Sequence, residues 1–370
     1  MGLLSLIWIF EKLGNKRKAL DRFGILILLF GFVRLLSIIF SKYPEVSVHS
    51  LYKEALFYFG FFSINYYLKV LDKQRLIYIV YGFIISAFVV AGIGVILFNL
   101  GSVERAQSVT SGYSAFSSYL LTGIGLSLCV HYRSGRKYIA LAWLTGVSLI
   151  FAGIITSLGR TNIAIAIALF GLALLFRKIE IKPAILIATI TLVLSSVSFY
   201  NNRGGVTERI ENPVGLSDRD IILKGAKALI LEQPLIGFGP RTFQKIFPYS
   251  DQLSDKGVGS WHNDFLDVYF ESGILGLIAF LLIIYTVLRE AIRYLRQKQN
   301  QETFYRDIVM GVFLAVIGLV LSAMTAGFIN SPTLSIVFAF LISLLSAVIF
   351  RQRQQLNQLL TAHPGITANA

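Results

Sequence analysis

The chain has 370 residues, of which 55% are hydrophobic, and its mean hydropathy is +0.69. Apolar runs of membrane length recur along it, which excludes an ordinary soluble domain. The single cysteine, Cys129, lies inside an apolar run, so disulfide frameworks and thiolate metal sites are excluded too. Because the four histidines show no ligand spacing, the sequence predicts neither a metal ion nor a cofactor.

The first ten residues are apolar but too short to span a bilayer, and basic residues follow them. We therefore expect an interfacial segment and not a cleavable signal peptide. The later apolar runs predict an all-α fold, a polytopic transmembrane helical bundle of about ten spans. The predicted spans cover residues 23–40, 54–69, 75–99, 114–132, 138–157, 161–176, 183–200, 264–288, 308–329 and 332–350.

The positive charges predict the orientation of this bundle. Four alternate connections between the spans, together with the stretches just before the first span and just after the last, hold 21 Lys and Arg residues. The opposite short loops hold only Lys42, Lys53, Arg105 and Arg160. Basic residues collect in cytoplasmic loops, so both termini are expected to be cytoplasmic. Orientation thus accounts for most of the net charge of +14 and removes the case for nucleic acid as a partner.

This topology divides the chain into five parts, with one large loop on the periplasmic or extracellular side. They are a cytoplasmic or interfacial segment (1–22), a bundle of about seven spans (23–200), the outer loop (201–261), about three further spans (262–350) and a cytoplasmic tail (351–370).

The outer loop has internal structure of its own. Ser217, with an acid three residues later, resembles a capping box and predicts an amphipathic helix of about fourteen residues. The run 234–240 contains two prolines and two glycines, which turn the chain. Three aromatic residues, Phe243, Phe247 and Tyr249, are expected to pack down on the membrane surface.

The outer loop is also basic, against the usual charge bias. Arg160 joins it from a short loop at the membrane boundary. Arginine forks match phosphate oxygens, which favours an anionic ligand, although long loops escape the charge rule and these residues could contact lipid headgroups instead. The basic residues of the loop are Arg203, Arg209, Arg219, Lys224, Lys227, Arg241, Lys245 and Lys256.

The end of the loop carries the most distinctive pattern, His262-Asn263 at the start of an apolar run. On a continuous helix Gly273 would lie about 20° and Gly276 about 40° from His262 around the axis. The two glycines would then let a neighbouring helix approach closely below the imidazole. The alternative is an interfacial histidine that caps a helix beside Trp261, an aromatic of the membrane belt.

Taken together, these motifs resemble the O-antigen ligase and O-antigen polymerase superfamily of integral-membrane glycosyltransferases. The resemblance covers roughly residues 155–290, and the order of its elements matches the family. Those elements are Gly159-Arg160 opening a span, Arg219 with Leu223, the turn Pro234-Leu235-Ile236-Gly237-Phe238-Gly239, and His262-Asn263 followed after nine residues by Gly273 and Gly276.

The resemblance implies transfer of a glycan from a polyprenyl (undecaprenyl) diphosphate carrier to an acceptor hydroxyl, at the outer face of the bacterial inner membrane and without a metal. It implies that His262 is the base and that Arg160 and Arg219 bind the diphosphate. The residue types suit this chemistry, because a leaving diphosphate needs neutralisation and histidine titrates near neutrality. Asn263, Arg203 and Arg241 are expected to support the site.

Several alternatives stay open at this point. The acceptor could be another glycan, as in a polymerase, or a lipid, as in a ligase. A transporter or flippase for a lipid-linked glycan or an anion would also use a basic outer cavity. Asp218 and Asp220 form an Asp-x-Asp pattern, but acids at a helix start need no metal to explain them.

Four further charged residues receive structural interpretations. Asp264 and Asp267 are attributed to the first turn of a helix, where the dipole favours acids. Glu271 is expected to pair inside the bundle, and Arg34 to snorkel to the outer interface.

Overall fold

The computed structural model describes residues 2–11, 19–110, 112–130, 136–202, 207, 218–253, 258–297 and 302–362. Helices dominate this part of the chain and no strand occurs in it, so the predicted all-α class is confirmed. The helices are α1 (Gly2–Ile9), α3 (Arg22–Ile39), α4 (Pro44–His49), α5 (Leu51–Val70), α6 (Lys73–Asn99), α7 (Gly112–Cys129), α8 (Lys137–Thr156), α9 (Arg160–Leu175), α10 (Ile181–Asn201), α12 (Arg219–Leu229), α13 (Phe243–Ile246), α14 (Asp264–Arg296), α15 (Thr303–Ser322) and α16 (Pro332–Ala362), with a 3-10 turn at Ser250–Gln252.

Each of the ten predicted spans overlaps one of these helices. Seven helices in the described residues are long and apolar enough to cross a membrane: α3, α6, α8, α10, α14, α15 and α16. The others are α5, which carries charges at both ends, α9, which is shorter, and α7. A total of ten spans therefore stays a prediction.

Helix α7 is the centre of the bundle, and its residues from Ala115 to Cys129 are all buried. A helix surrounded by protein needs no lipid-facing side, which explains its many Ser and Gly residues. It crosses α15 closely, because a Cβ on Gly125 would lie 2.7 Å from the Cα of Ala315. The remaining helices pack around this pair, with α3 against α14 and α5 against α16.

The outer-loop region forms a small core of its own. In α12, Ile222, Ala226 and Leu229 face inward, as the amphipathic pattern predicts. Phe243 and Phe247 stack on each other and meet Trp261 edge-on. Phe243 and Phe247 are therefore buried in this core, with Tyr249 half-buried against it, and the packing of the loop on the membrane surface stays a prediction.

Trp261 joins this small core to α14. Its ring stacks on Phe270 at a centroid distance of 4.0 Å, and only 2% of Trp261 is exposed. Trp261 is thus a buried core residue and not an aromatic of the membrane belt.

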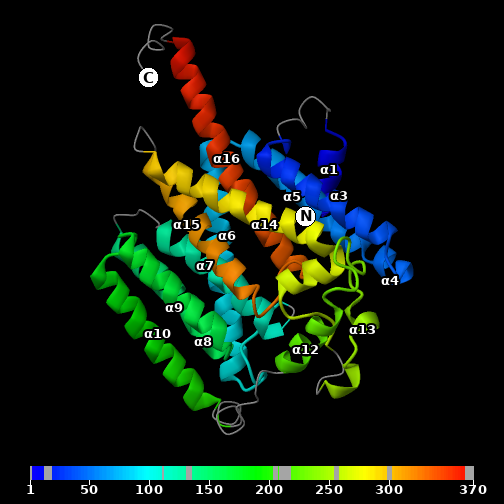
Figure 1. Cartoon of the computed structure of the whole chain (residues 1–370). Helices are drawn as coiled ribbons and strands as arrows, with labels where there is room; N and C mark the ends of the chain where they lie inside the picture. Colours follow the sequence, from blue (N-terminus) through cyan, green and yellow to red (C-terminus); the bar gives the residue numbers. More distant parts are fainter. Residues whose placement is uncertain are drawn as a thin grey trace.

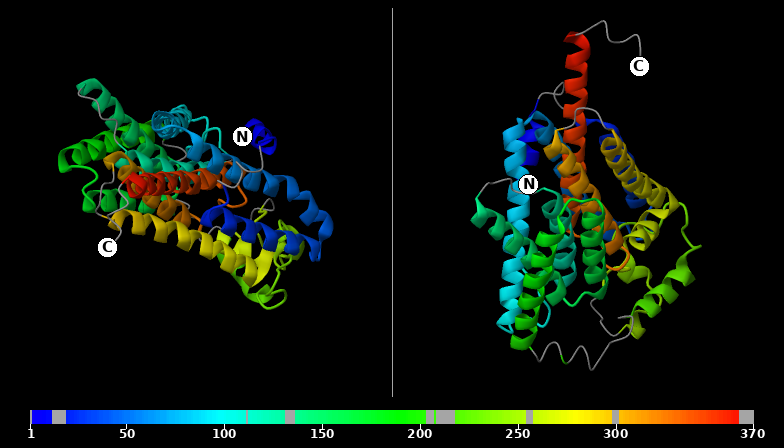
Figure 2. Two further views of the ribbon diagram at one scale, coloured as in Figure 1. Left: turned by 90° about the horizontal axis from the view of Figure 1, so that it is seen from above. Right: turned by 90° about the vertical axis from the view of Figure 1, so that its left-hand side faces the viewer.

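Figures 1 and 2 show α12, α13 and the connection between α15 and α16 at one end of the bundle, while the C-terminal end of α16 projects from the other. We call the first of these the loop end; it comprises residues 218–253, 258–263 and 323–331. At the other end α16 continues as a helix through Ala362, so part of the expected tail extends the last helix.

Candidate active site

His262 and Asn263 lie immediately before α14 and not within it. The Asn263 Oδ1 atom accepts hydrogen bonds from the backbone N–H groups of Phe265 (2.9 Å) and Leu266 (3.2 Å), which caps the helix. His262 adopts a left-handed backbone conformation with φ of 50° and its side chain is exposed. A continuous helix from His262 to Gly276 is therefore a wrong prediction, because the cap turns the chain at Asn263.

Asp264 anchors the connection between α15 and α16, residues 323–331. Its carboxylate is fully buried and accepts from the backbone N–H groups of Phe328 (2.7 Å) and Ile329 (3.2 Å). A Cβ on Gly327 would lie 2.7 Å from the same carboxylate, so the chain passes very close. These contacts explain why α15 ends at Ser322 although the apolar run continues, and the predicted span 308–329 is too long at this end.

Three of the predicted site residues bind backbone carbonyl groups of this connection. The Asn263 amide donates to Met324 O (3.2 Å) and the Arg219 guanidinium to Thr325 O (3.0 Å). The Arg241 guanidinium donates to Asn330 O (3.0 Å). The structure thus gathers Asn263, Arg219 and Arg241 around residues 323–331, with His262 adjoining Asn263 in the chain.

Arg160 lies at the same end of the bundle. Hydrogen bonds through α7 connect the start of its helix, α9, to residues 323–331. Two residues after it, the Asn162 amide donates to Ser117 Oγ (2.7 Å). The neighbouring Ser118 hydroxyl bonds Ser322 Oγ at 2.7 Å, where residues 323–331 begin. Arg160 itself is exposed and makes no hydrogen bond or ion pair with the described residues.

The guanidinium groups of Arg219 and Arg241 are not paired with acids of the described residues. Each donates to a backbone carbonyl oxygen instead. Carbonyl groups orient a guanidinium without neutralising it, so these side chains attract anions. Arg203, the remaining arginine predicted to support the site, lies outside the described residues, as does the predicted cap Ser217.

Gly273 breaks α14 where the turn 233–240 crosses it. Its backbone angles, φ 66° and ψ −168°, are not helical. The break leaves the carbonyl groups of Phe270 and Glu271 available, and these accept from the N–H groups of Phe238 (2.7 Å) and Gly239 (3.2 Å). The predicted close approach at Gly273 exists, but the approaching backbone is this turn and not another helix.

Gly276 also differs from its prediction. A Cβ on Gly276 would meet the side chain of Ser272 in its own helix. It therefore permits the local course of α14 after the break and does not mark a contact with a neighbouring helix.

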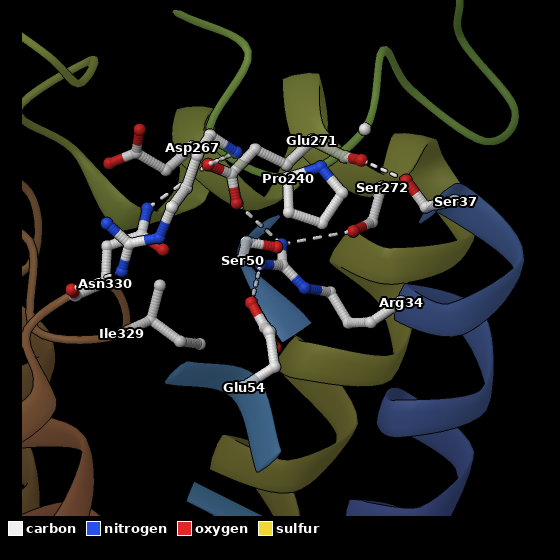
Figure 3. A network of polar contacts seen from close by, with 12 residues as sticks. Arg34, Ser37, Ser50, Glu54, Pro240, Asp267, Glu271, Ser272, Ile329 and Asn330 are labelled. Atoms are coloured by element: carbon white, nitrogen blue, oxygen red, sulfur yellow. Dashed lines mark hydrogen bonds and ion pairs between the residues drawn. The ribbon is translucent and has the colours of Figure 1, made fainter. Parts of the chain in front are cut away.

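A buried ion-pair network lies behind the turn (Figure 3). Arg34 is only 3% exposed and pairs with Glu54 and, at 2.7 Å, with Glu271. The pairing of Glu271 inside the bundle is thus confirmed, whereas the snorkelling of Arg34 is wrong. The network was missed because a charge within an apolar span signals that a partner exists without identifying it.

From the sequence, Asp267 is attributed to the helix dipole alone, but its side chain also makes a specific hydrogen bond. Its buried carboxylate accepts from the backbone N–H of Trp261 at 3.1 Å.

Among the described residues no group of three or more His, Cys, Asp and Glu residues is placed to hold a metal ion. Transfer without a metal stays a prediction.

The segment that contains these motifs also resembles a known family. Residues 145–281 match the family model described as O-antigen ligase. This is the family to which the sequence motifs pointed, and the matched segment includes Arg160, Arg219, Arg241, His262 and both glycines of α14. The match indicates an enzyme of the membrane glycosyltransferase type. No curated protein matches the chain.

The anchoring role of Asp264 gives a testable prediction. Asp264→Ala should destabilise the protein by roughly 2–4 kcal/mol, because two buried N–H groups lose their acceptor. It should also lower activity, since residues 323–331 hold Asn263 and Arg219. Thermal unfolding of the purified protein measures the first effect, with Asp220→Ala, on the exposed face of α12, as the control. Equal unfolding temperatures for both variants would contradict the anchoring role.

Proposed function

We propose that the protein transfers a glycan from a polyprenyl diphosphate carrier to an acceptor hydroxyl at the loop end of the bundle, on the periplasmic or extracellular side of the bacterial inner membrane. His262 removes the proton of the acceptor, and Arg160 and Arg219 bind the diphosphate. The observation that carries this proposal is that Asn263 and Arg219 bind the adjacent carbonyl groups of Met324 and Thr325. That contact brings a charged guanidinium to the residues beside the exposed imidazole.

The chemistry requires two separate tasks of these residues. The leaving diphosphate carries negative charge, which guanidinium groups stabilise as the glycosidic bond to the carrier breaks. The attacking hydroxyl must lose its proton, which an exposed imidazole accepts. Attack opposite the leaving diphosphate inverts the configuration of the anomeric carbon. Arg241 adds positive charge beside Asn330, and Asn263 fixes the backbone that carries the imidazole.

The arginines give the most direct prediction of this function. Arg219→Ala and Arg160→Ala should each weaken donor binding by roughly 10–100-fold, because each removes hydrogen bonds to a charged ligand. The matched control is Lys227→Ala, which removes an exposed positive charge from the same helix, α12, and should change binding little.

The assay uses the purified full chain in nanodiscs, an undecaprenyl-diphosphate-linked glycan as donor, and a chelator throughout. Product formed with a second glycan identifies a polymerase, and product formed with a lipid core identifies a ligase. If wild-type protein transfers no glycan from any donor but moves the lipid-linked glycan across the bilayer, the proposal is wrong and the protein is a transporter.

A further inference from the structure

The buried ion-pair network of Figure 3 joins α3 and α5 to α14. Arg34 on α3 donates to Glu271 Oε2 at 2.7 Å and to Ser272 Oγ at 3.2 Å, both on α14. Its other terminal nitrogen pairs with Glu54 on α5. One buried arginine therefore engages two carboxylates that lie on different helices.

The second oxygen of Glu271 faces the loop end. Its Oε1 atom accepts from the backbone N–H of Arg241 at 2.8 Å and from the Asn330 amide at 3.3 Å. The Arg241 guanidinium is directed elsewhere, to the carbonyl of Asn330 at 3.0 Å. Glu271 thus holds the backbone of Arg241 without neutralising its side chain.

The charges around Arg241 explain why this arrangement needs Arg34. A small cleft here is lined by Lys53, Glu54, Arg241 and Asn330, with Phe30 and Phe57 behind them. Among five of these side chains, Arg34, Lys53 and Arg241 carry three positive charges and Glu54 and Glu271 two negative ones, a balance of +1. The neighbouring buried Asp267, which accepts from the Trp261 N–H, is the same in every comparison below. If Arg34 were neutral, the two carboxylates would balance Lys53 and Arg241 completely.

We propose that Arg34 is a positioning residue: by engaging the carboxylates of Glu54 and Glu271, it leaves the Arg241 guanidinium without a carboxylate partner, so that the charge of Arg241 acts on the substrate. This inference rests on the proposed function, in which an anionic diphosphate binds at the loop end. Arg34 is buried and touches no substrate, so its effect passes through Glu54 and Glu271. Partly buried charges are weakly screened, and one unit of charge at this site changes the affinity for an anion.

The test is a series of variants that differ in this charge balance. R34Q lowers the balance to 0, E54Q raises it to +2, and the double variant R34Q/E54Q restores +1. The probe is undecaprenyl diphosphate without a sugar, titrated onto the full chain in nanodiscs. We expect binding roughly tenfold weaker for R34Q, severalfold tighter for E54Q, and within about threefold of wild type for the double variant.

The E54Q result separates this role from simple packing, because a variant that merely loosens the fold cannot bind the probe more tightly. R22Q is the control: it removes an arginine that pairs with Glu290 at the opposite end of the bundle and should not change binding. Weaker binding for all three variants, or unchanged binding for R34Q, would overturn the inference. Failure of wild-type protein to bind undecaprenyl diphosphate would instead overturn the proposed function.

Discussion

His262→Ala is expected to lower the rate of glycan transfer by roughly 10²–10⁴-fold, the usual contribution of a general base. Donor affinity should change little, because in the proposed function Arg160 and Arg219, and not His262, bind the diphosphate. The fold should also persist, since the imidazole is exposed and the α14 cap is made by Asn263. The measurement is single-turnover transfer at saturating donor, together with the thermal unfolding of the same preparation.

Two further observations sharpen this prediction. His49→Ala removes another exposed histidine, on α4, and should leave transfer at the wild-type level. Added imidazole should restore part of the activity of His262→Ala, because a small base can enter the space left by the side chain. Full transfer by His262→Ala would exclude it as the base, and a loss of donor affinity equal to the loss in rate would reassign it to binding.

The helical architecture could be predicted because it depends on local composition. Apolar length located all ten predicted helices, and the amphipathic pattern located α12. Where prediction failed, a contact distant in sequence had changed the local outcome. Phe328 and Ile329 belong to an apolar run, yet their backbone N–H groups bind Asp264, 64 and 65 residues earlier. A hydropathy profile does not show that a distant carboxylate will bind these N–H groups in place of a helical carbonyl group.

For the candidate site, the sequence proposes residues but does not show the contacts that hold them. The motifs identified His262, Arg160 and Arg219, and the family match covers all three. Arg34 and Glu271 are 237 residues apart, and no local pattern relates them. The turn 234–239 and the glycine at 273 were recognised as separate motifs. The structure shows that each supplies hydrogen-bonding groups to the other, since Phe238 N–H binds Phe270 O and Ile274 N–H binds Pro234 O.

The largest expected effect on stability follows from these reciprocal hydrogen bonds between the turn and α14. Gly273→Ala should destabilise the protein by about 3 kcal/mol or more, because φ 66° with ψ −168° is a conformation open almost only to glycine. An added Cβ would also overlap the carbonyl of Leu235 and lie 2.5 Å from Ile236 N. Both atoms are backbone, so no side chain can move aside to relieve the contact.

The consequence should reach the proposed site as well as the fold. Displacing the turn 233–240 from α14 would remove the acceptors of Phe238 and Gly239 and shift Arg241, which follows the turn directly. Thermal unfolding, followed by tryptophan fluorescence, to which Trp261 stacked on Phe270 contributes, should report a clearly lower unfolding temperature, and transfer should be lost. Gly171→Ala in α9 is the matched control: its Cβ meets nothing within 4 Å, and alanine favours a helix by about 1 kcal/mol. If Gly273→Ala were as stable as Gly171→Ala, α14 would have to run unbroken through residue 273, and the docking of the turn against it would be wrong.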